Sequence, residues 1–291
     1  MSPVLPMATA DPRLDAGRSP LRALRGRGAL AIGATILAVV TVACSAAPLI
    51  APGSPTDLDP LHPLAPLFSA GHPLGTDEFG RDLTSRILYG GRYDLAIAFG
   101  ATGVTLVVGT AVGMLSAYGG GRTDRVVMRV VDLFFAFPFI VLVIAIIAAL
   151  GPSLLNMFIA LWVTSWVGYA RIAHGQTRTA LGLGYVVAAQ ALGYSRWRVL
   201  LRHVLPTVAP SALVFAMVDA VGNVLLGASL GFLGIGVRQP APEWGSMIAE
   251  GQNYLLSQWW LSLAPGAALV VLGVAFSLVG DGLADVLRAD R

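Results

Sequence analysis

The chain has 291 residues, of which 56% are hydrophobic and only 12% are charged, and its mean hydropathy is +0.74. Soluble domains carry about 25% charged residues, so this chain has too little polar surface to cover a globule of its size in water. The composition therefore indicates a protein whose solvent is lipid. The net charge is +3 and the basic residues lie between apolar blocks, which argues against a nucleic-acid-binding face. A single cysteine, Cys44, excludes an internal disulfide framework and a Cys-rich metal site.

The N-terminal part predicts a polar tail and then a first membrane span. Residues 1–28 are interrupted by prolines and end in arginines, so we expect a disordered, basic, cytoplasmic tail. Residues 29–50 form a charge-free apolar run, long enough to cross a hydrocarbon core of about 30 Å. A cleaved signal peptide, or a lipoprotein signal ending at Cys44, is the competing interpretation. The run is longer than a typical signal core, and further spans follow it.

Five more apolar runs predict an all-α, polytopic fold with six transmembrane helices. They are residues 95–118, 133–150, 154–170, 208–237 and 259–287. We divide the rest into an extracytoplasmic segment, 51–92, a five-helix core, 93–287, and a short cytoplasmic tail, 288–291. The pair Gly109 and Gly113 on the second run has the spacing at which helices approach closely, within the chain or against a partner.

The arginines predict the orientation. With the N-terminus inside, all arginines fall in cytoplasmic segments except Arg81, Arg86, Arg92 and Arg238. Cytoplasmic loops of membrane proteins carry such an excess, so both termini are expected in the cytoplasm. The outer segment 51–92 and the inner loop 171–207 are too long to be simple turns, which makes them candidate functional segments.

The inner loop predicts two short helices. Ala188 and Ala189 favour a helix, and Gly193 suits the position that ends it. Residues 196–203, which include Arg196 and Arg202, fit a second, basic amphipathic helix that ends at Leu205-Pro206. The residues alone leave two interpretations open: a helix held by lipid headgroups, or a docking element for a cytosolic partner.

This loop resembles the EAA loop of ABC importer permeases. Ala188-Ala189, Gly193 and Leu205-Pro206 match that pattern, while Val187 stands where the family has glutamate. The resemblance implies a coupling helix that seats in a groove of an ATP-hydrolysing subunit.

The outer segment contains a longer match. Residues 72–92, HPLGTDEFGRDLTSRILYGGR, resemble the LGTDxxGRDxxSR signature of the dipeptide and oligopeptide permease C subunits. The matching positions include Gly75, Thr76, Asp77, Gly80, Arg81 and Asp82. Residues 229–251 resemble a second segment of that family, although Gly227 stands where relatives often have glutamate. Without the resemblance, the charged residues of the signature also fit a solvated, self-paired helix start. The resemblance implies an outer surface near a docked substrate-binding protein.

Two polar residues lie inside a predicted span. Asp219 and Asn223 are four residues apart and therefore share a helix face. A charge at membrane depth usually faces a bundle interior or an aqueous path, so a place on the translocation path is one hypothesis. A hydrogen bond between helices is the other.

The chain is not expected to be an enzyme or to hold a cofactor. It has no lysine, so it cannot form a P-loop for ATP, and its four histidines lack metal-ligand spacing. The resemblance implies a bacterial cell-membrane permease that pairs with a homologous permease, with ATPase subunits that bind ATP and Mg, and with an extracytoplasmic peptide-binding protein. Peptide is the implied cargo, and nickel complexes or glutathione are alternatives. An intramembrane enzyme built on Asp219 and Asn223 is a remote alternative function.

Overall fold

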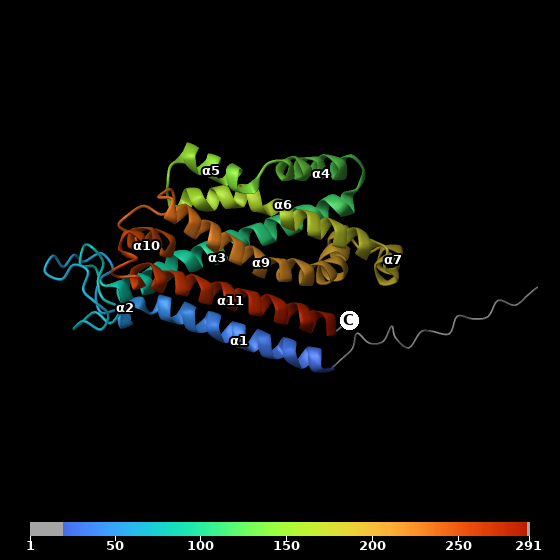
Figure 1. Ribbon diagram of the computed structural model, residues 1–291. Helices are drawn as coiled ribbons and strands as arrows, with labels where there is room; N and C mark the ends of the chain where they lie inside the picture. Colours follow the sequence, from blue (N-terminus) through green and yellow to red (C-terminus); the bar gives the residue numbers. More distant parts are fainter. Residues whose placement is uncertain (1–19, 290–291) are drawn as a thin grey trace, which may run out of the picture.

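The computed structural model describes residues 20–289, which are mainly helical. The long helices are α1 (Pro20–Ser45), α3 (Leu83–Gly119), α6 (Leu154–Leu181), α9 (Leu205–Phe232) and α11 (Trp260–Ala289). They run side by side, with the extended segment 51–82 at one end of the bundle and α7 (Gly184–Ala191) at the other (Figure 1). No β-strand forms within residues 20–289, where pairing is limited to two isolated bridges. The expected all-α fold is therefore confirmed.

The remaining helices are short. They are α2 (Ala47–Ile50), α4 (Gly121–Ala136), α5 (Phe139–Leu150), α8 (Arg196–Val199) and α10 (Trp244–Gly251), together with a π-helical turn at Leu200–Val204 and a 3₁₀ turn at Gln252–Tyr254. The α4–α5 pair lies beside α6 along one flank of the bundle, whereas α1 and α11 pack together along the opposite flank (Figure 1).

The prediction of six membrane-spanning helices is not confirmed. Four helical segments of residues 20–289 are long and apolar enough to cross a membrane, and α4 with α5 makes a fifth if that bent pair is one span. The pair bends by 88° because Phe137 is extended (φ −96°, ψ 142°) ahead of Pro138, a residue that disfavours helix in its predecessor. The 12 residues of α5 reach only about 18 Å. The long helix α6 is not among these segments.

Two expected boundaries also differ. The first helix begins at Pro20, ahead of the expected start at 29, so residues 20–28 are helical rather than disordered. Residues 1–19 of the predicted tail lie outside the described residues. At the other end α11 continues to Ala289, into the segment 288–291 that was expected to be a tail.

The close-approach glycines of the second span are explained by packing within the chain. A Cβ at Gly109 would lie 2.3 Å from the carbonyl oxygen of Trp166, and one at Gly113 would lie 2.2 Å from that of Ala170. Both contacts are with the backbone of α6, so α3 and α6 can meet at this distance only without side chains. Of the two partners that the sequence left open, the structure shows the internal one.

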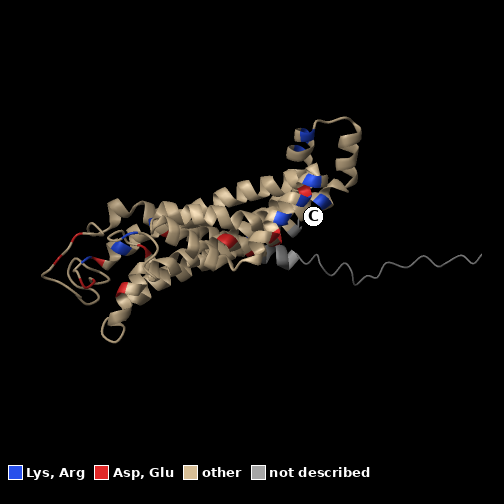
Figure 2. Cartoon of the chain, turned by 90° about the horizontal axis from the view of Figure 1, so that it is seen from above, with Lys and Arg blue, Asp and Glu red and all other residues tan. Residues whose placement is uncertain are grey.

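The charges separate along the bundle in a way that allows the predicted orientation to be tested. Figure 2 shows arginines gathered at the α7 end, whereas acidic residues and a few arginines lie together at the loop end. Leu61, at the loop end, is 86% exposed, and Arg196, at the α7 end, is also exposed.

In a Cys44→Ala background, we expect a membrane-impermeant thiol reagent added outside intact cells to label Leu61→Cys and to spare Arg196→Cys, because arginine-rich ends stay in the cytoplasm. Labelling of both positions after permeabilisation is the control. Outside labelling at position 196 would contradict the orientation.

Candidate functional site

The inner loop contains the turn that the sequence predicts at Gly193. Gly193 has φ +77°, a conformation that side chains with a Cβ rarely adopt. Its N–H donates to the carbonyl of Gln190 at 3.0 Å, and the N–H of Tyr194 donates to that of Ala189 at 3.2 Å. These two bonds form a Schellman motif that ends α7. Ser195 then caps α8 by accepting the N–H of Arg198 at 3.4 Å.

One face of this loop is built into the bundle. Val186, Val199 and Val204 are fully buried, in a cluster with Met114 of α3 and Ala173 of α6. Ala189 belongs to the inward face, because only 4% of it is exposed, whereas Ala188 is exposed. The two alanines of the motif therefore have different surroundings: one packs within the chain and the other is free to meet a partner.

The other face of the loop is apolar and basic. Its exposed apolar side chains are Leu183, Tyr185, Val187, Leu192, Tyr194 and Trp197. Arg196 and Arg202 are exposed too, and neither has an ion-pair partner among residues 26–287, whose side chains the structure describes. A surface that combines exposed aromatic residues with unpaired arginines has the composition of a protein-binding patch. We call residues 183–202 on this face the inner docking surface.

The expectation that Leu205-Pro206 ends the second helix is wrong. Residues from Arg196 to Phe232 form one continuous helical segment. The π-helical turn Leu200–Val204 joins α8 to α9, and the N–H of Leu205 donates to the carbonyl of Leu200, five residues back. Pro206 then falls in the first turn of α9, where a missing N–H costs least.

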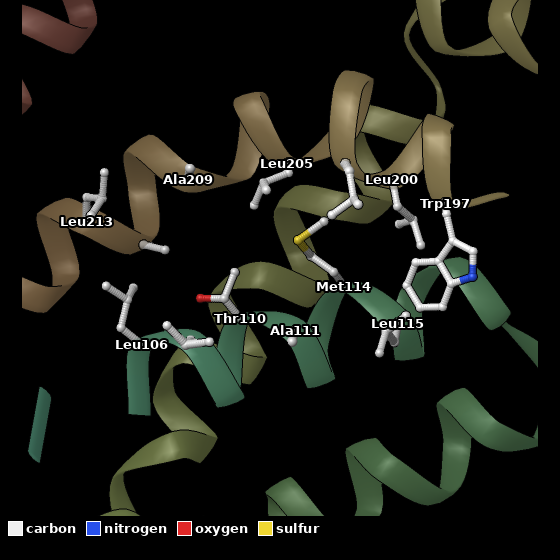
Figure 3. Close-up of a pocket in the computed structure, with 13 residues that line it drawn as sticks. Leu106, Thr110, Ala111, Met114, Leu115, Trp197, Leu200, Leu205, Ala209 and Leu213 are labelled. Atoms are coloured by element: carbon white, nitrogen blue, oxygen red, sulfur yellow. The ribbon is translucent and has the colours of Figure 1, made fainter. Parts of the chain in front are cut away.

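An apolar groove of about 400 Å³ adjoins the inner docking surface. It lies between α3 and the segment running from α8 into α9. Figure 3 shows Trp197 and Leu115 at one end of the groove, and Leu106 and Leu213 at the other. Its lining residues are almost all aliphatic, with Thr110 as a polar exception. Such a groove fits a lipid chain or an apolar helix.

At the opposite end of the bundle, the signature residues form a buried ion-pair cluster. Asp77 Oδ2 accepts hydrogen bonds from Arg81 Nε at 2.7 Å and Arg86 Nη1 at 2.5 Å. Glu250 Oε2 accepts from Arg86 Nη1 at 2.6 Å and Arg81 Nη2 at 3.0 Å. We call these four residues the outer clamp. It joins the extended segment to α3 and α10.

The neighbouring signature residues shape the turns around the clamp. Thr76 Oγ1 accepts the N–H of Ala65 at 2.8 Å and donates to the carbonyl of His62 at 2.6 Å. Asp82 caps α3 by accepting the N–H of Ser85 at 2.6 Å. Gly75 and Gly80 have φ near +75°, and a Cβ on Gly80 would lie 1.9 Å from the carbonyl oxygen of Asp59.

The signature is thus self-paired, as one interpretation proposed, but it is not solvated. Asp77, Arg81 and Arg86 are between 1% and 6% exposed. Their burial makes them internal supports, so any partner at this end would contact the loop that they hold rather than the clamp itself.

Replacing Arg86 by methionine should lower the free energy of unfolding by about 3–5 kcal/mol, because Asp77 and Glu250 would stay buried with one cation fewer. Thermal unfolding of the purified protein in detergent measures the change. Arg122→Met, at an exposed position with no ion pair among residues 20–289, is the control. Equal melting temperatures for the two variants would contradict a supporting role for the clamp.

The centre of the bundle contains the two polar residues predicted on one helix face. Asn223 is 2% exposed, and its Nδ2 donates to Thr102 Oγ1 of α3 at 3.0 Å and to Asp219 Oδ2 at 3.1 Å. Tyr169 of α6 donates its hydroxyl to the same Asp219 oxygen at 2.8 Å. Asn223 therefore ties α9 to α3, which is the structural role that the sequence left open.

Asp219 has a second environment besides this network. It lines a cavity of about 430 Å³ between the α4–α5 bend, α6 and α9. Phe215 lies beside it and packs edge-on against Tyr169, with ring centroids 4.8 Å apart. Asp219 is thus both a hydrogen-bonded part of the bundle and a polar group on a cavity wall.

The sequence did not predict two polar contacts, of which the first joins distant segments and the second caps a helix. Asp124 of α4 accepts from Ser116 Oγ at 2.8 Å and pairs with His174 Nε2 of α6 at 2.7 Å. Glu243 caps α10 through the N–H groups of Gly245 and Ser246, at 2.6 and 2.9 Å. Burial raises the pKa of the Glu243 carboxyl even though these two N–H groups act in the opposite direction. No local spacing signals either contact, apart from the position of Glu243 just before a helix.

Comparison with known proteins agrees with this architecture. The family described as the inner membrane component of binding-protein-dependent transport systems matches residues 109–290. The chain is 38% identical over 264 residues to the probable D,D-dipeptide transport system permease protein DdpC of Escherichia coli (strain K12), covering 91% of this chain and 88% of that protein. It is also 38% identical over 219 residues to the glutathione transport system permease protein GsiD of Pectobacterium atrosepticum, covering 75% of this chain and 73% of that protein.

A solved structure shares the fold. The MetNI methionine ABC transporter, in an inward facing conformation, gives a TM-score of 0.55 at 22% identity over 71% of this chain and 97% of the compared chain. At this identity the likeness shows the fold alone.

The fold and the comparisons define the class: a multi-pass permease of the inner membrane with the fold of an ABC importer. The chain belongs to the family of inner membrane components of binding-protein-dependent transport systems. Its resemblance to the dipeptide and oligopeptide permeases is thereby confirmed.

Proposed function

We propose that this chain forms one half of the translocation path of an ATP-driven peptide importer, together with a homologous permease. One observation carries the proposal: a single helical segment, Arg196–Phe232, joins the inner docking surface to the cavity lined by Asp219. A movement imposed at one end of a stiff helix reaches the other end. The names of the relatives, which include dipeptide and oligopeptide permeases, support peptide as the cargo.

The inner docking surface receives the ATPase in this proposal. Ala188 and Val187 are exposed on it, while Val186 and Ala189 fix the same helix to the bundle. A helix that is anchored on one side and exposed on the other transmits force from a partner. ATP and Mg would bind to that partner, and this chain would move without catalysing a reaction.

The second permease would cover the α4–α5 bend. Phe135, Phe137 and Phe139 are each more than 40% exposed there, beside the cavity that Asp219 lines. Large exposed apolar patches mark contact surfaces. Closing this side would convert the open cavity into a path between two subunits, while lipid would cover the outward apolar faces of α1 and α11.

An extracytoplasmic peptide-binding protein would dock at the opposite end, on the extended segment 51–82. Leu58, Leu61 and Phe68 are between 64% and 86% exposed on this segment. The outer clamp holds the segment against α3 and α10, so a partner bound there would contact a fixed surface.

Glutathione is the second candidate cargo, because one relative at 38% identity is a glutathione permease. Uptake by membrane vesicles that contain the assembled transporter separates the two. We expect labelled dialanine to enter on addition of ATP inside the vesicles, and labelled glutathione not to compete. Uptake of labelled glutathione with no uptake of dialanine would reverse the assignment.

Ala188→Trp and Gly193→Val should uncouple the transporter. The first places a large ring on the inner docking surface, and the second costs about 1–3 kcal/mol in a turn with φ +77°. Both should leave the permease in the membrane but reduce ATPase capture at least about tenfold and abolish substrate-stimulated hydrolysis. Ala189 is unsuitable for this test because it is buried.

Pull-down of the ATPase and hydrolysis in reconstituted membranes measure both effects. Arg129→Trp, which puts the same ring at an exposed position on α4, should behave as wild type. If Ala188→Trp keeps full ATPase binding and turnover, the loop is an interfacial helix rather than a docking element.

A further inference from the structure

The cavity beside Asp219 is aromatic and contains a single acid. Its volume is about 430 Å³, and its walls include the rings of Phe134, Phe135, Phe137, Phe139 and Phe215. Asp219 is the charged residue among its lining side chains. Aromatic faces are electron-rich and attract cations, and a carboxylate does so more strongly. A pocket of this composition is suited to a positively charged group with an apolar neighbour.

Two polar atoms of this cavity have hydrogen-bonding capacity to spare. Tyr169 and Asn223 both donate to Oδ2 of Asp219, whereas Oδ1 makes no hydrogen bond with the side chains described, those of residues 26–287. Ser165 also lines the cavity; it is 8% exposed, and its buried hydroxyl has no partner among the described residues. A buried polar group without a partner is costly, so an unused hydroxyl at a cavity wall points to a ligand.

We propose that this cavity binds the ammonium group of the transported peptide, an inference that rests on the proposed peptide import. An ammonium group has three N–H donors and no acceptor, and this cavity offers two acceptors with no hydrogen bond among the described side chains, Asp219 Oδ1 and Ser165 Oγ. The carbons next to the nitrogen would lie against the phenylalanine rings.

A site for the amino terminus would recognise a group that every free peptide carries. The amino terminus is present whatever the side chains are, so a site for it would accept many sequences. The same chemistry is offered by a lysine side chain, and the experiment below separates these two sources.

The test uses the charge selectivity of thiol reagents in membrane vesicles that contain the assembled transporter. In a Cys44→Ala background, Phe137→Cys places a thiol on the cavity wall, which in the proposed assembly lines the path between the two permeases. We expect the cationic reagent 2-aminoethyl methanethiosulfonate to react faster than the anionic 2-sulfonatoethyl reagent. Adding Asp219→Asn should reduce this rate ratio about tenfold, because the carboxylate no longer concentrates cations.

Asp281→Asn makes the same chemical change at an exposed position of α11 and should leave the ratio unchanged. Alanylalanine amide should slow the labelling, and N-acetylalanylalanine amide should not. If N-acetylalanyl-lysine amide also protects, a lysine side chain can supply the ammonium group; if it does not, the amino terminus is the ligand.

A rate ratio unaffected by Asp219→Asn, or equal protection by the acetylated and free alanine peptides, would overturn the proposal. Peptide uptake by the wild-type vesicles is measured in parallel. Normal uptake with a charge-independent ratio would refute the ammonium site alone. Absence of uptake would refute the import proposal, and the reagent ratio would still decide whether the cavity selects cations.

Discussion

The continuity of the helix from Arg196 to Phe232 is the constraint on which the rest of the structure depends. Its first turns lie on the inner surface of the bundle, and its middle reaches the cavity through Asp219. The π-helical turn at Leu200–Val204 allows Pro206 to enter without breaking the segment. A loop that ended at Pro206 would leave the inner docking surface hinged and free to move without the bundle. The continuous helix instead makes loop and cavity parts of one body.

The opposite end of the bundle is held still by different means. The outer clamp buries two arginines and two carboxylates, and it ties the extended segment to α3 and α10. A bundle that is fixed at one end and driven at the other would change shape near its middle, where α9 meets Tyr169 and Thr102 through hydrogen bonds between side chains.

Local features were predictable from the sequence, whereas contacts between distant segments were not. The turn at Gly193 and the shared face of Asp219 and Asn223 follow from helix geometry over a few residues. The pairing of Arg86 with Glu250 joins residues 164 positions apart, and no spacing rule encodes it. The count of six spans was not confirmed because hydropathy alone does not register the bend that Pro138 imposes. The matching signature located the clamp, but burial, known only from the fold, showed that it supports the structure from within.

We expect the inner docking surface and the Asp219 cavity to move together. Spin labels at Phe137→Cys and Val218→Cys, in a Cys44→Ala background, would report the distance between the α4–α5 bend and α9 by pulsed electron paramagnetic resonance. In the assembled transporter, ATP binding should change this distance. Replacing Arg202 and His203 by two glycines, which softens the join between α8 and α9, should remove the change. An ATP-dependent distance that survives the glycine replacement would contradict transmission through the continuous helix.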